Sequence, residues 1–319
     1  MRLPFLRFLC GAFLAFSVGR AAERIERQAF PLSPGSTVKL ESYRGRLIVE
    51  PGDGAEVRLM VRANSMLEKP EAAERALRAL QLEAEQAGST VIFRIRNPRE
   101  SGIRFSIGDP EQLDIELQLT VPNPCNLDLT LNDGGIQVGR MRGNMKAVTR
   151  MGTIFFRGVD GTLDARSEAG DLVVSHCSGA LKLRSISGSF RVGPVGGFAD
   201  VYGYGGEIEV QAAGGGIKAE TSGADLVVGF QHPVTSPATL RTGGANVIVT
   251  LDRRSACTLD LRASIFGKVT NVKDRLPLVA TNGGLGKSRF AGMLNGGGPK
   301  IEARASGGHV YLQEAPVVE

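Results

Sequence analysis

The stretch Gly170–Val192, GDLVVSHCSGALKLRSISGSFRV, decides the fold class because one pattern recurs in it after eighteen residues. In each copy a glycine is followed by two apolar residues that lie two positions apart: Gly170, Leu172 and Val174, then Gly188, Phe190 and Val192. Further copies begin at Gly135, Gly152, Gly206, Ala224 and Ala245. A fixed period of this kind is typical of stacked repeats, in which each repeat buries its apolar face against its neighbours. The sequence therefore predicts an all-β fold, a parallel β-solenoid or β-helix.

Each repeat contains two expected strands. A second glycine-led strand begins eight or nine residues after the first, at Gly143, Gly161, Gly179, Gly197 and Gly215. Because apolar and polar residues alternate in these strands, one face is expected to point inward and the other outward. We expect the resulting coils, each made of two strands and their turns, to stack in parallel about 4.8 Å apart. Glycine is expected at the corners because it adopts positive φ without steric cost.

The repeat also predicts which side chains meet. The inward-pointing Leu172, Phe190 and Ile208 are expected to stack directly over one another. The outward positions in the second strand alternate in sign: Lys146, Asp164, Lys182, Asp200 and Lys218. Opposite charges on neighbouring strands suit cross-strand pairing. Each exposed pair contributes only about 0–1 kcal/mol, so this alternation supports the register more than the stability.

The first residues have the pattern of a signal peptide. Arg2 and Arg7 precede an apolar run over Phe8–Val18, and small residues suited to cleavage follow at Ser17–Ala22. The run is shorter than the roughly 20 residues that a membrane-spanning helix needs. We expect residues 1–22 to direct export and to be cleaved, with an uncleaved anchor as the alternative. Cleavage removes Arg2, Arg7 and Arg20, which lowers the formal charge from +5 to +2.

Two regions are expected after the signal. Residues 23–121 have the pattern of a small α/β region that caps the stack, with one helix over Pro70–Ala87. Pro70 near its start, Gly88 after its end and apolar residues at helical spacing favour that helix. Residues 122–319 are expected to form the solenoid. Its closing coils are expected at Thr258–Arg262, Lys268–Val272, Lys300–Ala303 and His309–Leu312, interrupted by the glycine-rich stretch Gly283–Gly298.

The sequence contains no motif that predicts a catalytic, cofactor-binding or metal-binding residue. The three histidines lack metal-ligand spacing, and Gly286–Lys287–Ser288 lacks the upstream glycine of a phosphate-binding loop because Thr281 stands there. A Ser–His–Asp arrangement stays open because such triads assemble in space. Cys177 is expected to be a small buried hydrophobic residue rather than a reactive thiol.

Two function classes fit this scaffold. A non-enzymatic structural or binding role at the cell envelope is the first. The alternative is a polysaccharide-acting enzyme, a lyase or hydrolase, which needs paired carboxylates in a groove. Asp171, Glu207 and Asp225 are expected beside the turn glycines of separate coils. Asp171 and Glu207 are two coils apart, at about 10 Å from strand spacing, just outside the usual pairing range for glycosidases. No basic run interleaved with aromatic residues occurs, which disfavours nucleic-acid binding.

One outward strip is a candidate binding site. Arg166, Arg184 and Tyr202 are expected at the same outward position of three consecutive coils, with Lys182 two residues before Arg184. Guanidinium and aromatic groups on a flat face favour binding of an anionic glycan through charge and stacking. The alternative interpretation is an ordinary solvated strand face.

The order of segments resembles a known family. A signal peptide precedes Gly45–Asp53 (GRLIVEPGD), then a helix, then Gln118–Pro122 (QLTVP), then the glycine-led coils. The chain closes with Phe266–Val269 (FGKV) and Leu294–Pro299 (LNGGGP). Over residues 37–313 this is similar to the bacterial putative-adhesin family of exported domains.

The resemblance implies a β-solenoid and a location in the periplasm, at the cell surface or outside the cell. The resemblance supplies no catalytic residue. From the residues themselves we expect a glycan or an envelope protein as partner, no transmembrane span in the mature chain and no cofactor, and the oligomeric state stays open.

Overall fold

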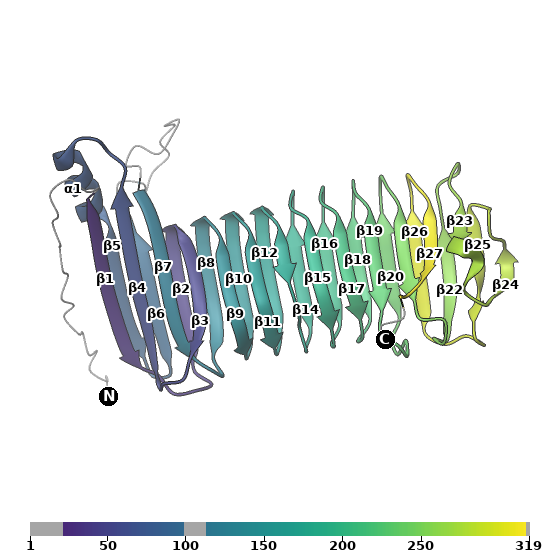
Figure 1. The fold of residues 1–319 in the computed structure, drawn as a ribbon, viewed down its shortest axis with the longest axis horizontal. Coiled ribbons are helices and arrows are strands. Elements are labelled where there is room, and N and C mark those ends of the chain that lie inside the picture. The colour runs from purple at the N-terminus through teal and green to yellow at the C-terminus, as the bar shows by residue number, and fades with distance from the viewer. Residues whose placement is uncertain (1–21, 99–112, 317–319) are drawn as a thin grey trace. The chain divides into compact units, whose positions relative to one another are not determined.

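The computed structural model describes residues 22–98 and 113–316. This part of the chain is nearly all β, with two large, mostly parallel sheets and one α-helix (Figure 1). Contacts divide the chain into two compact units, one up to Gly152 and one from Thr153. The proposed signal peptide lies outside the described residues. No helix among the described residues is long and apolar enough to cross a lipid bilayer.

The N-terminal unit contains ten strands and helix α1 within the described residues. They are β1 (Glu23–Pro31), β2 (Thr37–Arg44), β3 (Arg46–Gly52), β4 (Glu56–Ser65), α1 (Pro70–Ala79), β5 (Gln81–Ala87), β6 (Thr90–Arg96), β7 (Leu113–Pro122), β8 (Asn126–Asp133), β9 (Ile136–Arg142) and β10 (Met145–Met151). Sheet A of this unit has the order β1-β4-β7-β3-β9, and sheet B has the order β10-β8-β2-β6-β5. Strands β2 and β3 pair in parallel with β8 and β9, so parallel pairing begins near residue 37.

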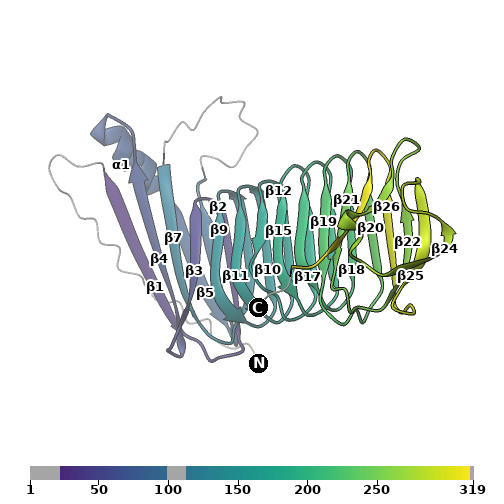
Figure 2. The ribbon, with the colours of Figure 1, turned by 45° about the vertical axis from the view of Figure 1, so that its right-hand side comes forward.

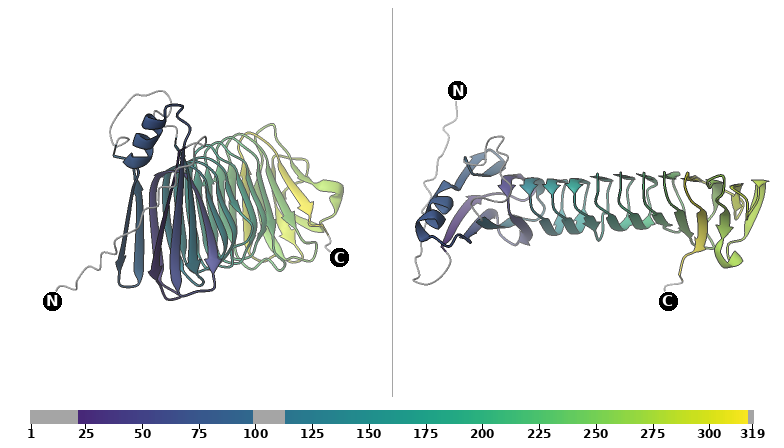
Figure 3. Two further views of the ribbon diagram at one scale, coloured as in Figure 1. Left: turned by 60° about the vertical axis from the view of Figure 1, so that its left-hand side comes forward. Right: turned by 90° about the horizontal axis from the view of Figure 1, so that it is seen from above.

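The C-terminal unit continues the same alternation between two sheets, which lie as two layers (Figure 3). Its strands are β11 (Ile154–Asp160), β12 (Leu163–Ala169), β13 (Leu172–Val174), β14 (Leu181–Ser185), β15 (Phe190–Val195), β16 (Ala199–Gly203), β17 (Ile208–Ala213), β18 (Ile217–Thr221), β19 (Leu226–Phe230), β20 (Ala238–Thr242), β21 (Val247–Leu251), β22 (Cys257–Arg262), β23 (Val269–Asn271), β24 (Leu278–Gly283), β25 (Arg289–Leu294), β26 (Lys300–Ala305) and β27 (Val310–Glu314). A 3₁₀ turn covers Val272–Asp274. Sheet A of this unit has the order β11-β13-β15-β17-β19-β21-β27-β23, and sheet B has the order β24-β25-β22-β26-β20-β18-β16-β14-β12.

The predicted register is confirmed in the C-terminal unit. Leu172 pairs with Phe190, and Phe190 pairs with Ile208, so each residue lies beside the one eighteen positions later. All three side chains are at most 1% exposed. Burying a large apolar side chain of this kind contributes about 1.5–3 kcal/mol. The core is therefore a continuous line of apolar side chains between the two sheets.

The corner glycines have two different physical reasons. Gly161 and Gly170 have φ of 155° and 149°, a region that favours glycine, as the sequence predicts. Gly188 and Gly206 do not have positive φ, but a Cβ atom there would overlap the backbone carbonyl of the preceding coil, Gly170 and Gly188 respectively. In these coils glycine is needed because neighbouring turns approach each other too closely for any side chain.

The expected helix over Pro70–Ala87 is wrong in its second half. The helix ends at Ala79, because Leu80 adopts an extended conformation with φ −65° and ψ 124°. The following residues form β5, which pairs antiparallel with β6. Its sequence alternates apolar and charged residues, and Glu85 forms an ion pair with Arg94 at 2.8 Å. Pairing with β6 thus overrides the helical propensity of this segment.

The guanidinium of Arg24 holds the end of α1. Its Nη1 donates hydrogen bonds to the carbonyl oxygens of Leu77 and Leu80, at 2.6 and 2.7 Å. These carbonyls belong to the last turn, which lacks partners within the helix. The positive charge also suits the negative end of the helix dipole. Together with its packing against β4, this contact fixes α1 on the N-terminal unit (Figure 3).

The closing strands do not lie in chain order. The last strands in the sequence, β26 and β27, lie inside the stack: β26 pairs with β20 and β22, and β27 pairs with β21 and β23. The glycine-rich segment Gly283–Gly298 is not a plain loop, because β25 within it pairs antiparallel with β22 and β24. Figure 2 shows β20, β26, β22 and β25 next to one another. The antiparallel pair covers the edge that β22 would otherwise expose, which protects it from pairing with another chain.

Candidate functional site

The predicted strip residues are neighbours on three strands of sheet B. Arg166 on β12 pairs in register with Arg184 on β14, and Arg184 pairs with Tyr202 on β16. Lys182 lies two residues before Arg184 on the same face. Buried residues alternate with these four along the strands, so the four side chains point outward, away from the core. The structure therefore brings the predicted strip together.

Two cations of the strip are held by carboxylates. The guanidinium of Arg184 forms an ion pair with Asp200 and donates to the carbonyl oxygens of Leu183 and Asp200 at 2.8 and 2.9 Å. The Nζ atom of Lys182 lies 3.6 Å from a carboxylate oxygen of Asp164. The charges of these two side chains are balanced locally. The strip therefore offers less free positive charge than the sequence predicts.

Two apolar side chains extend the strip at the adjacent turns. Ile186 is 54% exposed and Tyr204 is 63% exposed, and Tyr202 itself is 43% exposed. Ile186 and Tyr204 are at matching positions of neighbouring coils, because the N–H of Gly205 donates to the carbonyl oxygen of Ile186 at 3.0 Å. The eighteen-residue period relates Ile186 to Tyr204, so the sequence contained the signal that locates them. We call the set Arg166, Arg184, Ile186, Tyr202 and Tyr204 the Arg–Tyr patch.

Two of the carboxylates considered for an enzyme, Asp171 and Asp225, have structural roles. The side chain of Asp171 accepts a hydrogen bond from the N–H of Ser189 at 2.9 Å. The side chain of Asp225 accepts one from the N–H of Asn246 at 2.8 Å and one from its side-chain amide at 3.1 Å. Each of these contacts joins a turn to the next coil. They account for an acidic residue beside the corner glycine without any catalytic role.

One histidine–serine contact bears on the alternative of an enzyme. The Nδ1 atom of His232 lies 3.1 Å from the Oγ atom of Ser255. Ser255 is completely buried, and the nearby Asp252 accepts hydrogen bonds from the guanidinium of Arg254 at 2.8 and 3.0 Å. These bonds lower the pKa of Asp252. A nucleophile must reach its substrate, and the carboxylate that would orient the histidine is engaged elsewhere. The contact therefore fits a structural role.

The three cysteines of the described chain are buried and free. Cys177 pairs with Val159 and Val195 at one corner of the stack, as predicted for a small hydrophobic residue. Burial raises the pKa of the Cys125 and Cys257 thiols to about 11 and also raises that of Cys177. The thiol form, which is the weaker nucleophile, therefore predominates at neutral pH.

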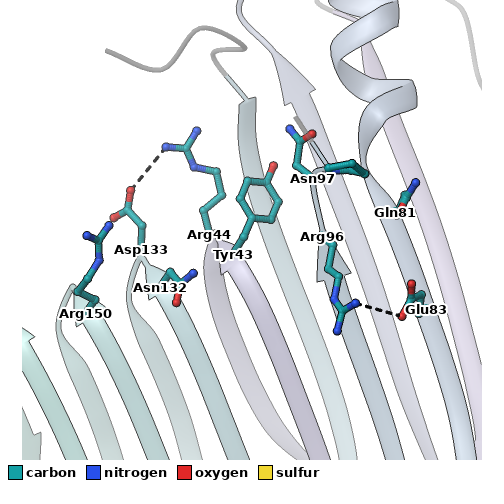
Figure 4. A pocket seen from close by; sticks show the side chains of 10 residues that line it. Tyr43, Arg44, Gln81, Glu83, Arg96, Asn97, Asn132, Asp133 and Arg150 are labelled. Atoms are coloured by element: carbon teal, nitrogen blue, oxygen red, sulfur yellow. Dashed lines mark ion pairs between the residues drawn. The ribbon is translucent and has the colours of Figure 1, made fainter. Parts of the chain in front are cut away.

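The N-terminal unit has a polar pocket that the sequence does not reveal. Its volume is about 710 Å³, and its lining comes from the ends of β2, β5, β6, β8 and β10 (Figure 4). Arg44 forms an ion pair with Asp133 at 3.5 Å, and Arg96 one with Glu83 at 4.0 Å. Arg150 also lines the pocket. These residues are far apart in the chain and meet because β2 lies between β6 and β8, an arrangement that no periodic pattern announces.

Comparisons with known proteins give a consistent but distant result. No protein-family model matches the chain, and no curated protein matches its sequence. Similar solved structures include a putative adhesin from Bacteroides fragilis, with 9% identity, coverage of 91% of this chain and 97% of that one, and a TM-score of 0.42. A putative lipid binding protein from Parabacteroides distasonis has 14% identity, coverage of 90% and 96%, and a TM-score of 0.41. A putative cell adhesion protein from Clostridium sporogenes has 8% identity, coverage of 91% and 100%, and a TM-score of 0.24.

The solved structures that are similar to this chain thus include putative adhesins, in agreement with the resemblance found in the sequence. At identities of 8–14% and TM-scores of 0.24–0.42, the function has to be inferred from this chain's own residues.

Proposed function

We propose that the protein is an exported, non-enzymatic, adhesin-like module of the cell envelope that binds a glycan on the Arg–Tyr patch. The observation that carries the proposal is the exposure of Tyr202 on sheet B and of Ile186 and Tyr204 at the turns that follow β14 and β16. Exposed apolar groups that gather in one place mark interaction sites more often than scattered ones do. Tyrosine and arginine are also the residues that dominate binding energy at interfaces.

The patch suits a sugar ring better than a simple anion. Tyrosine presents a flat apolar face and a hydroxyl group, which match the apolar face and hydroxyl groups of a pyranose. The guanidinium of Arg184 is already fixed by Asp200 and two carbonyl oxygens. A side chain held in its binding geometry loses less conformational entropy when the ligand arrives. Arg166, on the neighbouring strand, supplies further donors for hydroxyl or acidic groups.

The scaffold of this module is proposed to be a β-solenoid. In this proposal residues 1–22 form the cleaved export signal, residues 23–121 cap the first coil, and residues 122–319 form the solenoid. The eighteen-residue offset of the paired strands supports it in the C-terminal unit. A glycan or an envelope protein is the expected partner. No cofactor is needed for this function.

A glycan array with the purified mature chain tests the proposal. We expect binding to at least one glycan, and at least a tenfold loss of affinity in the Tyr202→Ala/Tyr204→Ala variant. Tyr311→Ala is the matched control, because Tyr311 points outward from β27 in the other sheet. Equal affinities of the wild type and the double variant would exclude the Arg–Tyr patch as the glycan-binding site. Shortening of a retained glycan on incubation would favour the enzyme instead.

A further inference from the structure

The turn between β22 and β23 exposes two large apolar side chains in succession. Ile265 is 85% exposed and Phe266 is 89% exposed. Single exposed apolar residues are common on protein surfaces, but two adjacent ones that are almost fully exposed are not. We call Ile265 and Phe266 the apolar tip. Nothing in the described chain packs over it, so it is available to a partner.

Four arginines lie in one row on the outer face of sheet B in the C-terminal unit. Arg241 on β20 pairs with Arg304 on β26, Arg304 pairs with Arg262 on β22, and Arg262 pairs with Arg289 on β25. All four alternate with buried residues along their strands and point outward. Like charges directly opposite each other on neighbouring strands are destabilising. This arginine row therefore has a stability cost that binding of an anion would relieve.

The row departs from the charge pattern of the same sheet. Further along it, Asp164, Lys182, Asp200 and Lys218 occupy paired positions and alternate in sign. Sign alternation is the arrangement that favours stability, and the arginine row lacks it. At the register position of the row itself, Arg166 and Arg184 also lie opposite each other, but Tyr202 and Glu220 then interrupt the series. The unbroken run of four arginines is therefore confined to this edge.

Carboxylates neutralise only part of the row. Arg262 lies 3.4 Å from Asp260, and Arg241 lies 3.5 Å from Glu220. Glu302 lies two residues before Arg304 and forms an ion pair with Lys300. The Nζ atom of Lys300 also lies 3.6 Å from a carboxylate oxygen of Asp260. Among the described residues, no carboxylate lies within ion-pair distance of Arg304 or Arg289. Five cations thus face three carboxylates: Arg241, Arg262, Arg289, Arg304 and Lys300 against Glu220, Asp260 and Glu302.

The apolar tip and the arginine row belong to the same edge of the unit. The N–H of Ala263, next to Arg262, donates to the carbonyl oxygen of Ser288, next to Arg289, at 2.9 Å. The base of the tip is thus fixed beside two arginines of the row. On the other side of the tip, the N–H of Val269 donates to the carbonyl oxygen of Lys287 at 2.8 Å, which places Lys268 and Lys287 there. Both ends of the turn are therefore fixed beside the same basic segment, at the base of the apolar tip.

We propose that this edge docks on the surface of an anionic phospholipid membrane, with Ile265 and Phe266 entering the interface and the arginine row facing the headgroups. An apolar group surrounded by cations is the combination by which proteins bind to such surfaces. An acidic polysaccharide would match the arginines but leaves the apolar tip without a counterpart. A second copy of the chain would bring two basic edges together. The site shares no residue with the Arg–Tyr patch and does not depend on glycan binding.

Co-sedimentation with lipid vesicles tests the proposal on the purified mature chain. Vesicles of phosphatidylglycerol and phosphatidylcholine are compared with vesicles of phosphatidylcholine alone. We expect binding only to the anionic vesicles, and weaker binding as salt is raised. The Ile265→Ser/Phe266→Ser variant should bind at least tenfold more weakly. Each of Arg304→Gln and Arg289→Gln should weaken binding about fivefold.

Matched controls separate docking from general effects. Phe198→Ser removes an apolar side chain that is 49% exposed on another turn, and Arg191→Gln removes an exposed cation on β15 of the other sheet. Both should bind vesicles like the wild type, and thermal unfolding confirms that all variants are folded. Equal binding of the tip variant and the wild type would overturn the proposal. Retention on polygalacturonate without binding to anionic vesicles would also overturn it, in favour of an acidic polysaccharide.

Discussion

The side-chain oxygen of Asn246 accepts a hydrogen bond from the backbone N–H of His309 at 2.9 Å, although the two residues are 63 positions apart in the chain. Asn246 in turn donates its own N–H to the carboxylate of Asp225 at 2.8 Å. Three neighbouring turns are thus linked, because a side-chain oxygen of one turn accepts a hydrogen bond from a backbone N–H of the turn beside it. The link between Asn246 and His309 is made only because β27 lies beside β21.

This chain of hydrogen bonds makes Asn246 a sensitive position. Replacement by the isosteric leucine removes the acceptor for the His309 N–H and the side-chain donor to Asp225, whereas the backbone N–H of residue 246 still reaches Asp225. A buried donor without an acceptor costs about 1–3 kcal/mol, so Asn246→Leu should lower the free energy of unfolding by that amount. Urea denaturation followed by circular dichroism measures it. Asn282→Leu, on the exposed strand β24, is the control and should change stability little. A loss as large in the control would show that the hydrogen bonds are not responsible.

The close approach of neighbouring turns gives a second prediction. A Cβ atom at Gly188 would overlap the carbonyl oxygen of Gly170, whereas a Cβ atom at Gly223 would lie 3.8 Å from its nearest neighbour, the carbonyl oxygen of Tyr204. Gly188→Ala should therefore force the backbones apart and destabilise the protein by about 1–3 kcal/mol, the usual cost of overpacking. Gly223→Ala should be close to neutral. Thermal unfolding gives the melting temperatures of the two variants. Equal melting temperatures would contradict the conclusion that the turns at Gly170 and Gly188 are too close together for a side chain.

The sequence is sufficient to predict the register because the period is a property of the core. Leu172, Phe190 and Ile208 must meet if each coil is to bury its apolar face, and they do. The same period locates Arg166, Arg184 and Tyr202, which are neighbours in the structure. Predictions that follow from local alternation and a constant offset are therefore reliable here.

The periodic pattern cannot predict the order in which coils lie where the chain departs from it. Strand β26 lies between β20 and β22, so Arg241, Arg304, Arg262 and Arg289 become neighbours in an order unlike that of the sequence. Nothing in the spacing of these residues indicates that they meet. The second half of the expected helix failed for a related reason, since β5 is held by its pairing with β6. In both places contacts between distant segments decide the outcome.

The buried thiols predict a loss of stability at alkaline pH. The pKa of Cys125 and Cys257 is raised from 9.0 to about 11 in the folded chain. Between pH 9 and 11 the unfolded state releases these protons and the folded state keeps them, so stability falls as pH rises. The fall should be about 1.4 kcal/mol per pH unit for each thiol. Below pH 9 both states are protonated and the thiols add no pH dependence.

Urea denaturation from pH 7 to 11 measures this effect. The control is the Cys125→Ala/Cys257→Ala variant, in which other alkaline titrations persist and only the contribution of the thiols is removed. The difference in stability between the wild type and this variant should therefore shrink as pH rises above 9. A constant difference over the whole range would show that the thiols titrate normally in the folded chain.

The position of the last coil predicts how the chain responds to truncation. Strands β26 and β27 are the last in the sequence but lie between β20 and β22 and between β21 and β23. Ending the chain after Gly297 therefore removes an interior coil, which separates β22 and β23 from the rest of the stack. We expect this chain to lose protease resistance from about residue 238 onward, whereas a chain that ends after Pro316 should resist like the full-length protein. If the stack were instead built in chain order, the shorter chain would lose only its last coil and would keep β20 to β23 protected.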